Sequence, residues 1–159
     1  MKRPYRIQYY PAIAAFAVCA SLCLHSAQAQ IPPFTEGMIT AAERSHYERT
    51  STFNEVIGVL DALDSQTELM HRETLLLTRE GRDVPIVVLA NPAVSSPAQA
   101  EASGKPVITI QANIHGGEVE GKEASLIAMR DILFGDKQHL LDNQILIFVP
   151  IYMPTAMTP

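Results

Sequence analysis

The sequence predicts an α/β fold in which helices pack on a mixed β-sheet. Two short apolar runs, residues 74–78 and 84–90, flank a turn that contains Gly81, a spacing typical of an antiparallel hairpin. Farther along the chain, residues 106–150 read as strand, helix and strand, which predicts a right-handed parallel crossover. A hairpin followed by such a crossover gives a sheet with both kinds of strand pairing.

Residues 1–29 are predicted to be a secretory signal peptide. Three basic residues near the start precede an apolar run from Ala12 to Leu24, and small residues then form a cleavage site that ends at Ala29. The alternative is a membrane anchor, but a spanning helix needs about 20 apolar residues and this run is shorter. We therefore expect no stable membrane anchor and an exported chain, periplasmic or secreted, after cleavage near Ala29.

Cleavage would leave an acidic chain without cysteine. The signal segment holds three basic residues and no acidic ones, which leaves nine basic against 17 acidic residues and a net charge of −8. A chain without a basic patch has no counterions to displace, so we expect no nucleic-acid partner. Both cysteines, Cys19 and Cys23, lie in the signal segment. A metal site in the mature chain must therefore use His, Asp or Glu.

The first half of the mature chain contains three further predicted segments. Residues 30–44, with Pro32, Pro33 and Gly37, are predicted to be an irregular lead-in. A helix is predicted from Ser51 or Thr52, because apolar residues recur at helical spacing to Leu63 and Glu55 completes a capping box. Residues 91–104 are rich in Pro, Ser and Ala and are predicted to be a surface loop.

The crossover accounts for most of the second half. Residues 106–114 are β-branched enough to predict a buried strand, and residues 144–150 predict another. Between them, residues 118–134 predict a helix that ends at Gly135. Its apolar face is expected at Ala124, Ile127, Ala128 and Ile132, and its solvated face at Glu120 and Glu123.

His115 and Glu118 are the candidate metal ligands. They flank Gly116 and Gly117 in the turn between a predicted strand end and a predicted helix start, where α/β sheets gather ligands. Imidazole and carboxylate suit zinc, although a zinc site that performs chemistry normally uses three protein ligands and a water. The alternative is an ordinary polar turn. Asn113 either orients His115 as a supporting residue or caps the helix.

Other polar residues are predicted to have simpler roles. His139 and Asp142 lie in a polar loop and His71 and Glu73 lie before a strand, so both pairs are expected at the surface. Arg82 is expected to be an ordinary turn charge, with contact to a substrate carboxylate as the alternative.

The segment Asn-Ile-His-Gly-Gly-Glu-Val-Glu-Gly-Lys-Glu-Ala from Asn113 resembles the first zinc-binding segment of the carboxypeptidase A-like zinc metallopeptidases. Residues 50–63, 80–85 and 148–152 resemble that family's opening helix, its glycine–arginine turn and a later strand, so the similarity covers residues 45–152. The resemblance implies the N-terminal half of a three-layer α/β sandwich of the carboxypeptidase-like (phosphorylase/hydrolase-like) type.

The same resemblance implies a function. His115 and Glu118 would be the first two ligands of a Zn2+ cofactor, and a zinc-activated water would attack the C-terminal bond of a peptide or peptide-like substrate. The family's third ligand, its general base and its substrate-binding arginines match no residue here, so no catalytic residue is assigned. Gly116 and Gly117 also differ from members that carry an arginine between the two ligands.

Residues 153–159 do not continue the resemblance and are predicted to be a frameshift tail, because a one-base slip after Tyr152 would restore an Asn-Ala-Asp-Gly-Asn loop. The chain would then be a truncated, inactive fragment, with Ile145 to Val149 exposed on an open sheet edge. Two alternatives stay open. One is a zinc amidohydrolase of the same fold that acts on small N-acyl amino acids, and the other is a non-catalytic binding fragment or pseudogene product.

Overall fold

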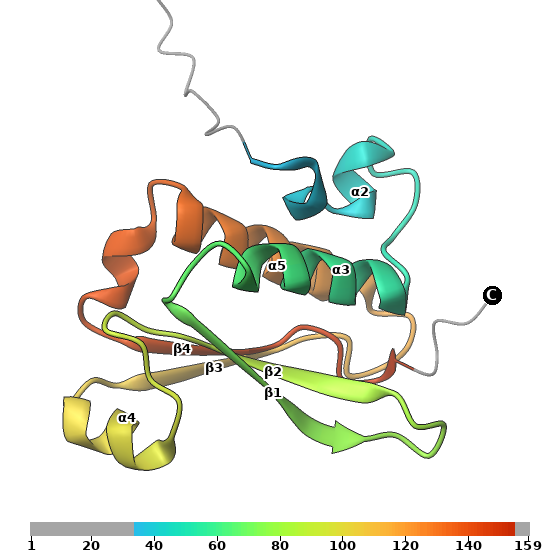
Figure 1. The fold of residues 1–159 in the computed structure, drawn as a ribbon. Coiled ribbons are helices and arrows are strands. Elements are labelled where there is room, and N and C mark those ends of the chain that lie inside the picture. The colour runs from blue at the N-terminus through green and yellow to red at the C-terminus, as the bar shows by residue number, and fades with distance from the viewer. Residues whose placement is uncertain (1–33, 155–159) are drawn as a thin grey trace, which may run out of the picture. The chain divides into compact units, whose positions relative to one another are not determined.

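A computed structural model describes residues 34–154 of the protein (Figure 1). The predicted signal peptide and residues 155–159 of the predicted tail lie outside the described residues. No helix in the described part is long and apolar enough to cross a membrane. The elements, in chain order, are η1 (Glu36–Met38), α2 (Ala41–Arg44), α3 (Phe53–Asp64), β1 (Met70–Leu77), β2 (Asp83–Leu89), α4 (Pro97–Ser103), β3 (Val107–Gln111), α5 (Val119–Phe134), η2 (Gln138–Leu141) and β4 (Ile145–Val149).

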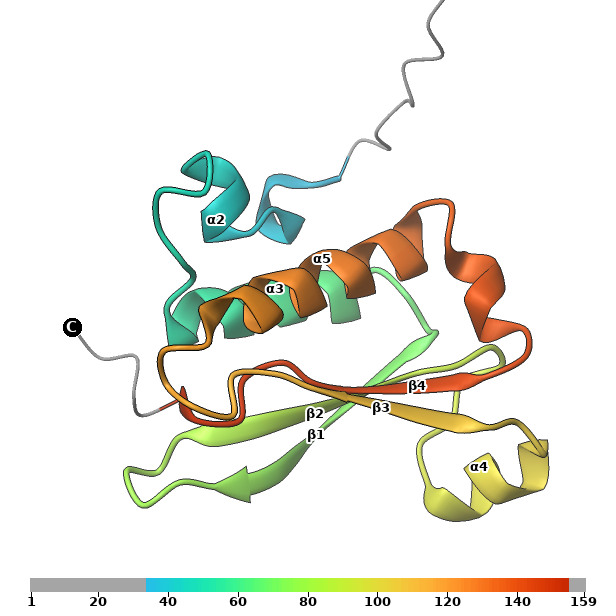
Figure 2. The same cartoon turned by 180° about the vertical axis from the view of Figure 1, so that it is seen from behind.

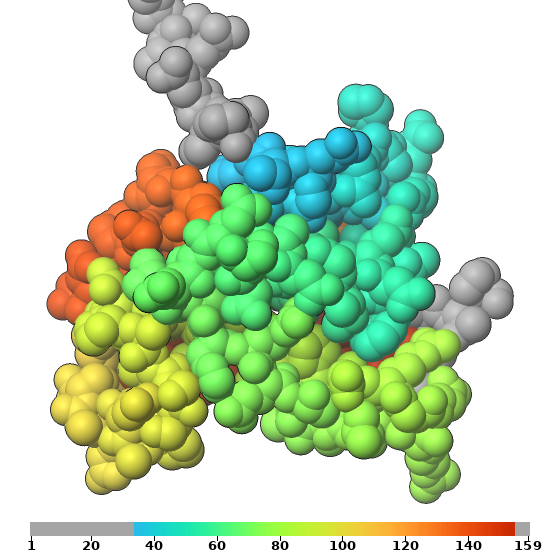
Figure 3. Space-filling view, viewed as in Figure 1, coloured from blue at the N-terminus to red at the C-terminus, as the bar shows by residue number. Residues whose placement is uncertain are grey.

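The four strands form one mixed sheet in the order β1-β2-β4-β3. Strands β1 and β2 form the predicted antiparallel hairpin, and its tip projects from the rest of the described chain in Figure 3. Strands β3 and β4 are parallel, with Val107 opposite Ile145 and Gln111 opposite Val149. The prediction of an α/β fold with a mixed sheet is confirmed.

The two edges of the sheet are β1 and β3, and the prediction that β4 lies on an open edge is wrong. β4 pairs with β2 on one side and with β3 on the other, so Ile145 and Phe148 are buried. β3 is correspondingly not the buried strand predicted for residues 106–114, because it pairs with β4 alone. Val107 and Ile108 are 48% and 43% exposed. An exposed edge with apolar side chains is a site for association with another strand.

Helices α3 and α5 lie side by side on one face of the sheet, and α4 lies on the other (Figures 1 and 2). The main core fills the space between those helices and the sheet. Its buried members include residues of α3, α5 and three strands, among them Leu60, Leu63, Met70, Leu126, Met129, Leu146 and Phe148. This layer fixes the position of α5 on the sheet.

The buried face of α5 differs from the prediction. Ala124 is exposed and Ile127 and Ala128 are only half-buried, whereas Leu126 and Met129 have no exposed surface. The face of α5 that packs on the core also carries charged residues. Apolar periodicity alone therefore does not predict which residues of α5 are buried.

Two segments predicted to be irregular contain helices. The lead-in at 30–44 includes η1 and α2, and Thr40 caps α2 by accepting a hydrogen bond from the Glu43 N–H at 3.2 Å. The predicted loop at 91–104 includes α4, which begins after the N-cap Ser96 and ends at Gly104, whose φ of 67° is left-handed. Both helices are short, so their capping residues predict them better than periodicity does.

Helix α3 begins at the predicted capping box. The Glu55 carboxylate accepts from the Thr52 N–H at 2.9 Å and also pairs with both terminal nitrogens of Arg49, at 2.9 and 2.7 Å. The hydrogen bond from Arg49, followed by those from Thr52, lowers the pKa of Glu55 to about 2 against the opposing effect of burial. The carboxylate therefore stays ionised far into acid.

Replacing Glu55 with glutamine should lower stability at neutral pH by up to about 1 kcal/mol, because the partly exposed ion pair with Arg49 is lost while the amide oxygen can still accept from the Thr52 N–H. Because its folded pKa of about 2 is below the ordinary value of 4.5, the contribution of Glu55 is complete above that ordinary value and declines as pH falls toward 2. Urea denaturation of wild type and variant at pH 7 measures the loss of stability, and the same measurement at pH 3 shows how much of it remains in acid. A difference between wild type and variant that is unchanged at pH 3 would contradict this assignment.

Candidate metal centre

The turn that carries His115 and Glu118 begins where the two parallel strands end together. The Ala112 N–H donates to the Val149 carbonyl at 2.9 Å, and the Tyr152 N–H donates to the Ala112 carbonyl at 3.2 Å. The Met153 N–H donates to the Asn113 carbonyl at 3.0 Å. The start of the turn is therefore fixed to the segment after β4, at the end of the sheet where ligands of α/β proteins gather.

His115 and Glu118 face each other across the turn. His115 Nδ1 lies 2.7 Å from Glu118 Oε1, and the His115 N–H donates to Glu118 Oε2 at 3.3 Å. The Glu118 N–H donates in turn to the His115 carbonyl at 3.1 Å. The side-chain hydrogen bond from His115 lowers the pKa of Glu118 below its ordinary value, so Glu118 is a carboxylate at neutral pH.

These two donors suit zinc. Nitrogen and oxygen ligands bind zinc at about 2.0–2.2 Å, so two tetrahedral donors on one ion lie about 3.3 Å apart. The 2.7 Å separation of Nδ1 and Oε1 is about 0.6 Å shorter than that value, so the two atoms would move apart to hold one ion. The side chains are 75% and 53% exposed, so an ion can approach from solvent. No group of three or more His, Cys, Asp or Glu residues that could hold a metal ion occurs among residues 34–154, so the described residues do not complete a three-ligand site.

Asn113 holds the backbone of both candidate ligands. Its Nδ2 donates to the His115 carbonyl at 2.9 Å and to the Glu118 carbonyl at 3.4 Å. The residue is 2% exposed and has a left-handed φ of 52°, a conformation that asparagine tolerates better than most residues. Its Oδ1 is buried without a partner. Glu118, and not Asn113, occupies the N-cap position of α5.

Gly121 lets the first turn of α5 approach the sheet. A Cβ added to Gly121 would lie 3.2 Å from the Ala112 Cβ, which leaves no room for a larger side chain. The helix start is thus in contact with the residue that precedes Asn113.

Replacing Gly121 with valine should therefore lower the free energy of unfolding by about 1–3 kcal/mol, because the added methyl groups overpack this contact. Thermal or urea unfolding measures the loss. Gly58 is a matched control: it lies in α3 with no atom within 4 Å of an added Cβ. An equal loss for Gly58→Val would show that the close contact at Gly121 is not the cause.

Glu123 is buried, and its prediction as a solvated residue is wrong. Its Oε1 accepts from the Thr50 hydroxyl at 2.6 Å and from the Ser51 N–H at 2.5 Å, and its Oε2 accepts from the Ser51 hydroxyl at 3.0 Å. The neighbouring Lys122 has no exposed surface, donates to the Ser51 carbonyl and lies 3.6 Å from Glu123 Oε1. Burial lowers the pKa of Lys122. These charged residues lie one turn along α5 from Glu118.

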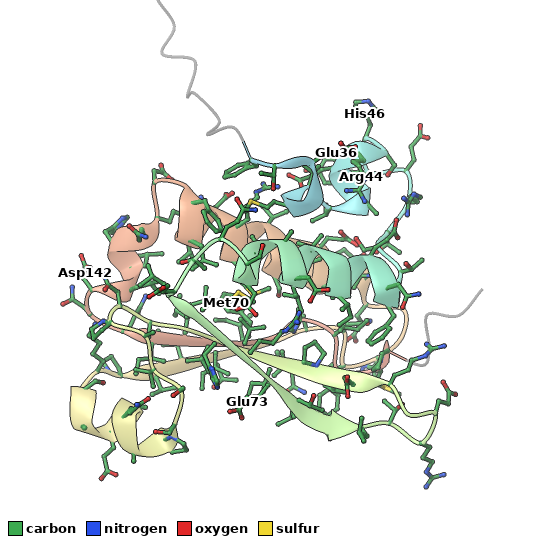
Figure 4. The ribbon with its side chains drawn as sticks, in the orientation of Figure 1. Glu36, Arg44, His46, Met70, Glu73 and Asp142 are labelled. Atoms are coloured by element: carbon green, nitrogen blue, oxygen red, sulfur yellow. The ribbon has the colours of Figure 1, made fainter. Side chains whose placement is uncertain are left out.

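The other candidate residues lie away from the turn or have structural contacts. His71 Nε2 lies 2.8 Å from Glu73 Oε1, and Glu73 is on the sheet face opposite α3 and α5 (Figure 4). This pair borders a largely apolar cavity of about 640 Å³ between α4 and the sheet. His139 lies in η2, and its Nδ1 is 3.0 Å from the Asp136 carbonyl. Arg82 donates to the Pro154 carbonyl at 2.8 Å.

A groove of about 600 Å³ extends from the turn between β3 and α5. Asn113 and Glu118 line it at the carboxyl end of β3, and most of the remainder is lined by apolar residues such as Ile110, Ala128 and Leu140. Glu118 therefore adjoins a surface that can receive an apolar side chain.

Comparison with solved structures shows the carboxypeptidase fold. The carboxypeptidase A from Helicoverpa armigera matches with a TM-score of 0.57 and 20% identity over 65% of this chain and 24% of its own. A metallo-carboxypeptidase from Burkholderia cenocepacia matches with a TM-score of 0.56 and 20% identity, over 67% of this chain and 28% of its own. Thrombin activatable fibrinolysis inhibitor matches with a TM-score of 0.58 and 15% identity, over 73% of this chain and 28% of its own. The chain thus spans about a quarter of each structure.

No curated protein sequence matches the chain significantly. The family profile described as zinc carboxypeptidase matches residues 56–154, a span that covers more than half of the chain and includes β1 to β4 and the His115–Glu118 turn. This chain therefore belongs to the zinc carboxypeptidase family.

Proposed function

We propose that this chain supplies the first two ligands, His115 and Glu118, of a zinc-dependent metallocarboxypeptidase site. The observation that carries the proposal is the juxtaposition of two exposed donors, 2.7 Å apart, at the carboxyl end of a parallel strand. Membership of the zinc carboxypeptidase family supports zinc as the ion. Asn113 would act as a supporting residue, because its amide bonds to the backbone of both ligands.

The chain's own residues would hold the ion and orient it. Bound zinc would polarise a carbonyl oxygen and lower the pKa of a water. His115 would present a neutral ring nitrogen, and Glu118 an ionised carboxylate that its lowered pKa favours. Because metal ligands must be deprotonated to bind, zinc affinity should fall as the solution is made acidic.

The substrate class that we propose is a peptide or peptide-like molecule hydrolysed at its C-terminal bond, with an apolar side chain in the groove beside β3. We further propose that the chain acts outside the cytoplasm, because its first 29 residues have the pattern of a signal peptide. Residues 34–154 hold the two proposed ligands and no group of three His, Cys, Asp or Glu residues that could hold a metal ion. We therefore propose that this part alone binds zinc without peptidase activity.

A hydrolysis assay tests this account of activity. The purified chain, with equimolar zinc, is incubated with peptides that end in an apolar residue and, separately, with an N-acyl amino acid. We expect no turnover of either above the rate of a Glu118→Ala variant. Zinc-dependent peptide release that the variant lacks would overturn the proposed inactivity, and release from the N-acyl amino acid alone would favour the amidohydrolase alternative.

A further inference from the structure

The buried pair Lys122–Glu123 joins two parts of the chain that are distant in sequence. Both residues lie in α5, and their partners Thr50 and Ser51 lie immediately before α3. Ser51 is itself fully buried, and its hydroxyl oxygen accepts from the Ala41 N–H at 3.2 Å. The cluster therefore connects the first turns of α5 to the start of α3 and to α2.

Stability alone is a poor reason for this cluster. Burying two charges costs several kcal/mol per ion, and apolar residues of similar volume are often as stabilising or more so. Lys122 occupies the position four residues before Leu126, on the same stripe of the helix, where an apolar side chain would be the ordinary choice. A buried charged pair at such a position is best explained by a requirement for one specific geometry.

The Lys122–Glu123 cluster fixes the position of the first turn of α5. Lys122 is one helical turn after Glu118, so a rotation or shift of this turn displaces the Glu118 side chain. On one side, Gly121 contacts Ala112 at the end of β3. On the other side, Glu123 accepts both the N–H and the hydroxyl of Ser51. The first turn of α5, which follows the candidate ligands in the chain, is therefore fixed both by its contact with β3's end and by its hydrogen bonds to Ser51.

We propose that Glu123 is a positioning residue for the metal centre, with Lys122 as its buried counter-charge: the hydrogen bonds from Ser51 to the Glu123 carboxylate set the start of α5 so that Glu118 meets His115. This inference rests on the proposed function of that pair. Neither residue contacts the ligand atoms, and each acts through the backbone of the helix. The resemblance assigns no role to either position.

The chain offers a matched control on the same helix. Arg130 is 5% exposed, and its Nη1 pairs with Glu43 Oε2 at 2.8 Å, which connects α5 to α2 by a comparable ion pair. It lies eight residues after Lys122, about 12 Å farther along the helix axis. An Arg130→Met variant therefore loses a similar long-range contact without disturbing the helix start.

Zinc titration calorimetry on the full chain tests the inference with two neutral double variants. Lys122→Met/Glu123→Leu removes every hydrogen bond between α5 and Ser51, and we expect its zinc Kd to rise about tenfold or more, as for residues that orient ligands. Lys122→Met/Glu123→Gln keeps an oxygen for the Ser51 N–H, and its Kd should stay within about threefold of wild type. Arg130→Met should match wild type. Equal weakening in Arg130→Met, or wild-type affinity in the leucine variant, would overturn the inference.

A second readout needs no metal. The ¹⁵N shifts of the His115 ring report its hydrogen bond to Glu118, and we expect them to move toward those of an exposed histidine in the leucine variant only. If the wild-type chain shows no saturable zinc binding, the proposed function fails while these shifts still judge the positioning role. Unchanged ring shifts in the leucine variant would refute that role.

Discussion

Replacing Glu123 with alanine should lower the free energy of unfolding by about 3–5 kcal/mol, the cost of removing one partner of a buried ion pair. The variant leaves the Lys122 ammonium without its carboxylate and removes the acceptor of three hydrogen bonds from Thr50 and Ser51. A loss of this size is a large part of the stability of a small domain.

Urea denaturation of the wild-type and variant chains measures the effect, and Glu120→Ala is the control. Glu120 is exposed in the same turn of α5, and its removal should cost no more than about 1 kcal/mol through the helix dipole. Both variants replace a glutamate with alanine in the same part of α5, and the replaced glutamates differ in burial. Similar losses for both would show that the Glu123 carboxylate is not buried with Lys122 as the structure describes.

Replacing either His115 or Glu118 with alanine should weaken zinc binding by at least about 100-fold, because removing even a residue that supports a ligand commonly costs 10–100-fold. Each variant leaves a single exposed donor on the turn, and one imidazole or one carboxylate holds zinc no better than any surface residue. The side chains are more than half exposed, so folding stability should change by less than about 0.5 kcal/mol.

The control for this pair of variants is already present in the chain. His71 and Glu73 form a second exposed pair with a nitrogen–oxygen distance of 2.8 Å, on the opposite face of the sheet. His71→Ala should leave zinc affinity unchanged. If His71→Ala removes the binding and His115→Ala does not, the ion binds beside α4 and the metal centre is wrongly placed.

The parts of the fold that local signals specify could be predicted from the sequence. Thr52 and Glu55 mark the start of α3 because a capping box depends on residues three apart. The hairpin and the crossover follow from turn composition and from apolar runs of the right length. The His115–Glu118 turn is likewise local, and its place at a strand end follows once residues 107–111 are recognised as a strand.

The parts of the fold that depend on contacts between distant segments could not be predicted from the sequence. Nothing in residues 145–149 indicates that β2 pairs along one side of them, and that pairing puts β3 at the sheet edge. Glu123 resembles any solvated helical glutamate until Ser51, 72 residues away, supplies its donors. One signal was available: Lys122 lies on the stripe of Leu126 and Met129, so a buried charge could have been suspected.

Metal binding at the turn is the central claim, and ¹⁵N NMR of the histidine rings during zinc titration tests it most directly. The described residues contain four histidines, His46, His71, His115 and His139. We predict that the ring nitrogens of His115 shift in a saturable manner, that Glu118→Ala abolishes the shift, and that the other three rings stay unchanged. Saturable shifts at His71 or His139 with none at His115 would contradict the assignment of this turn as half of a zinc site.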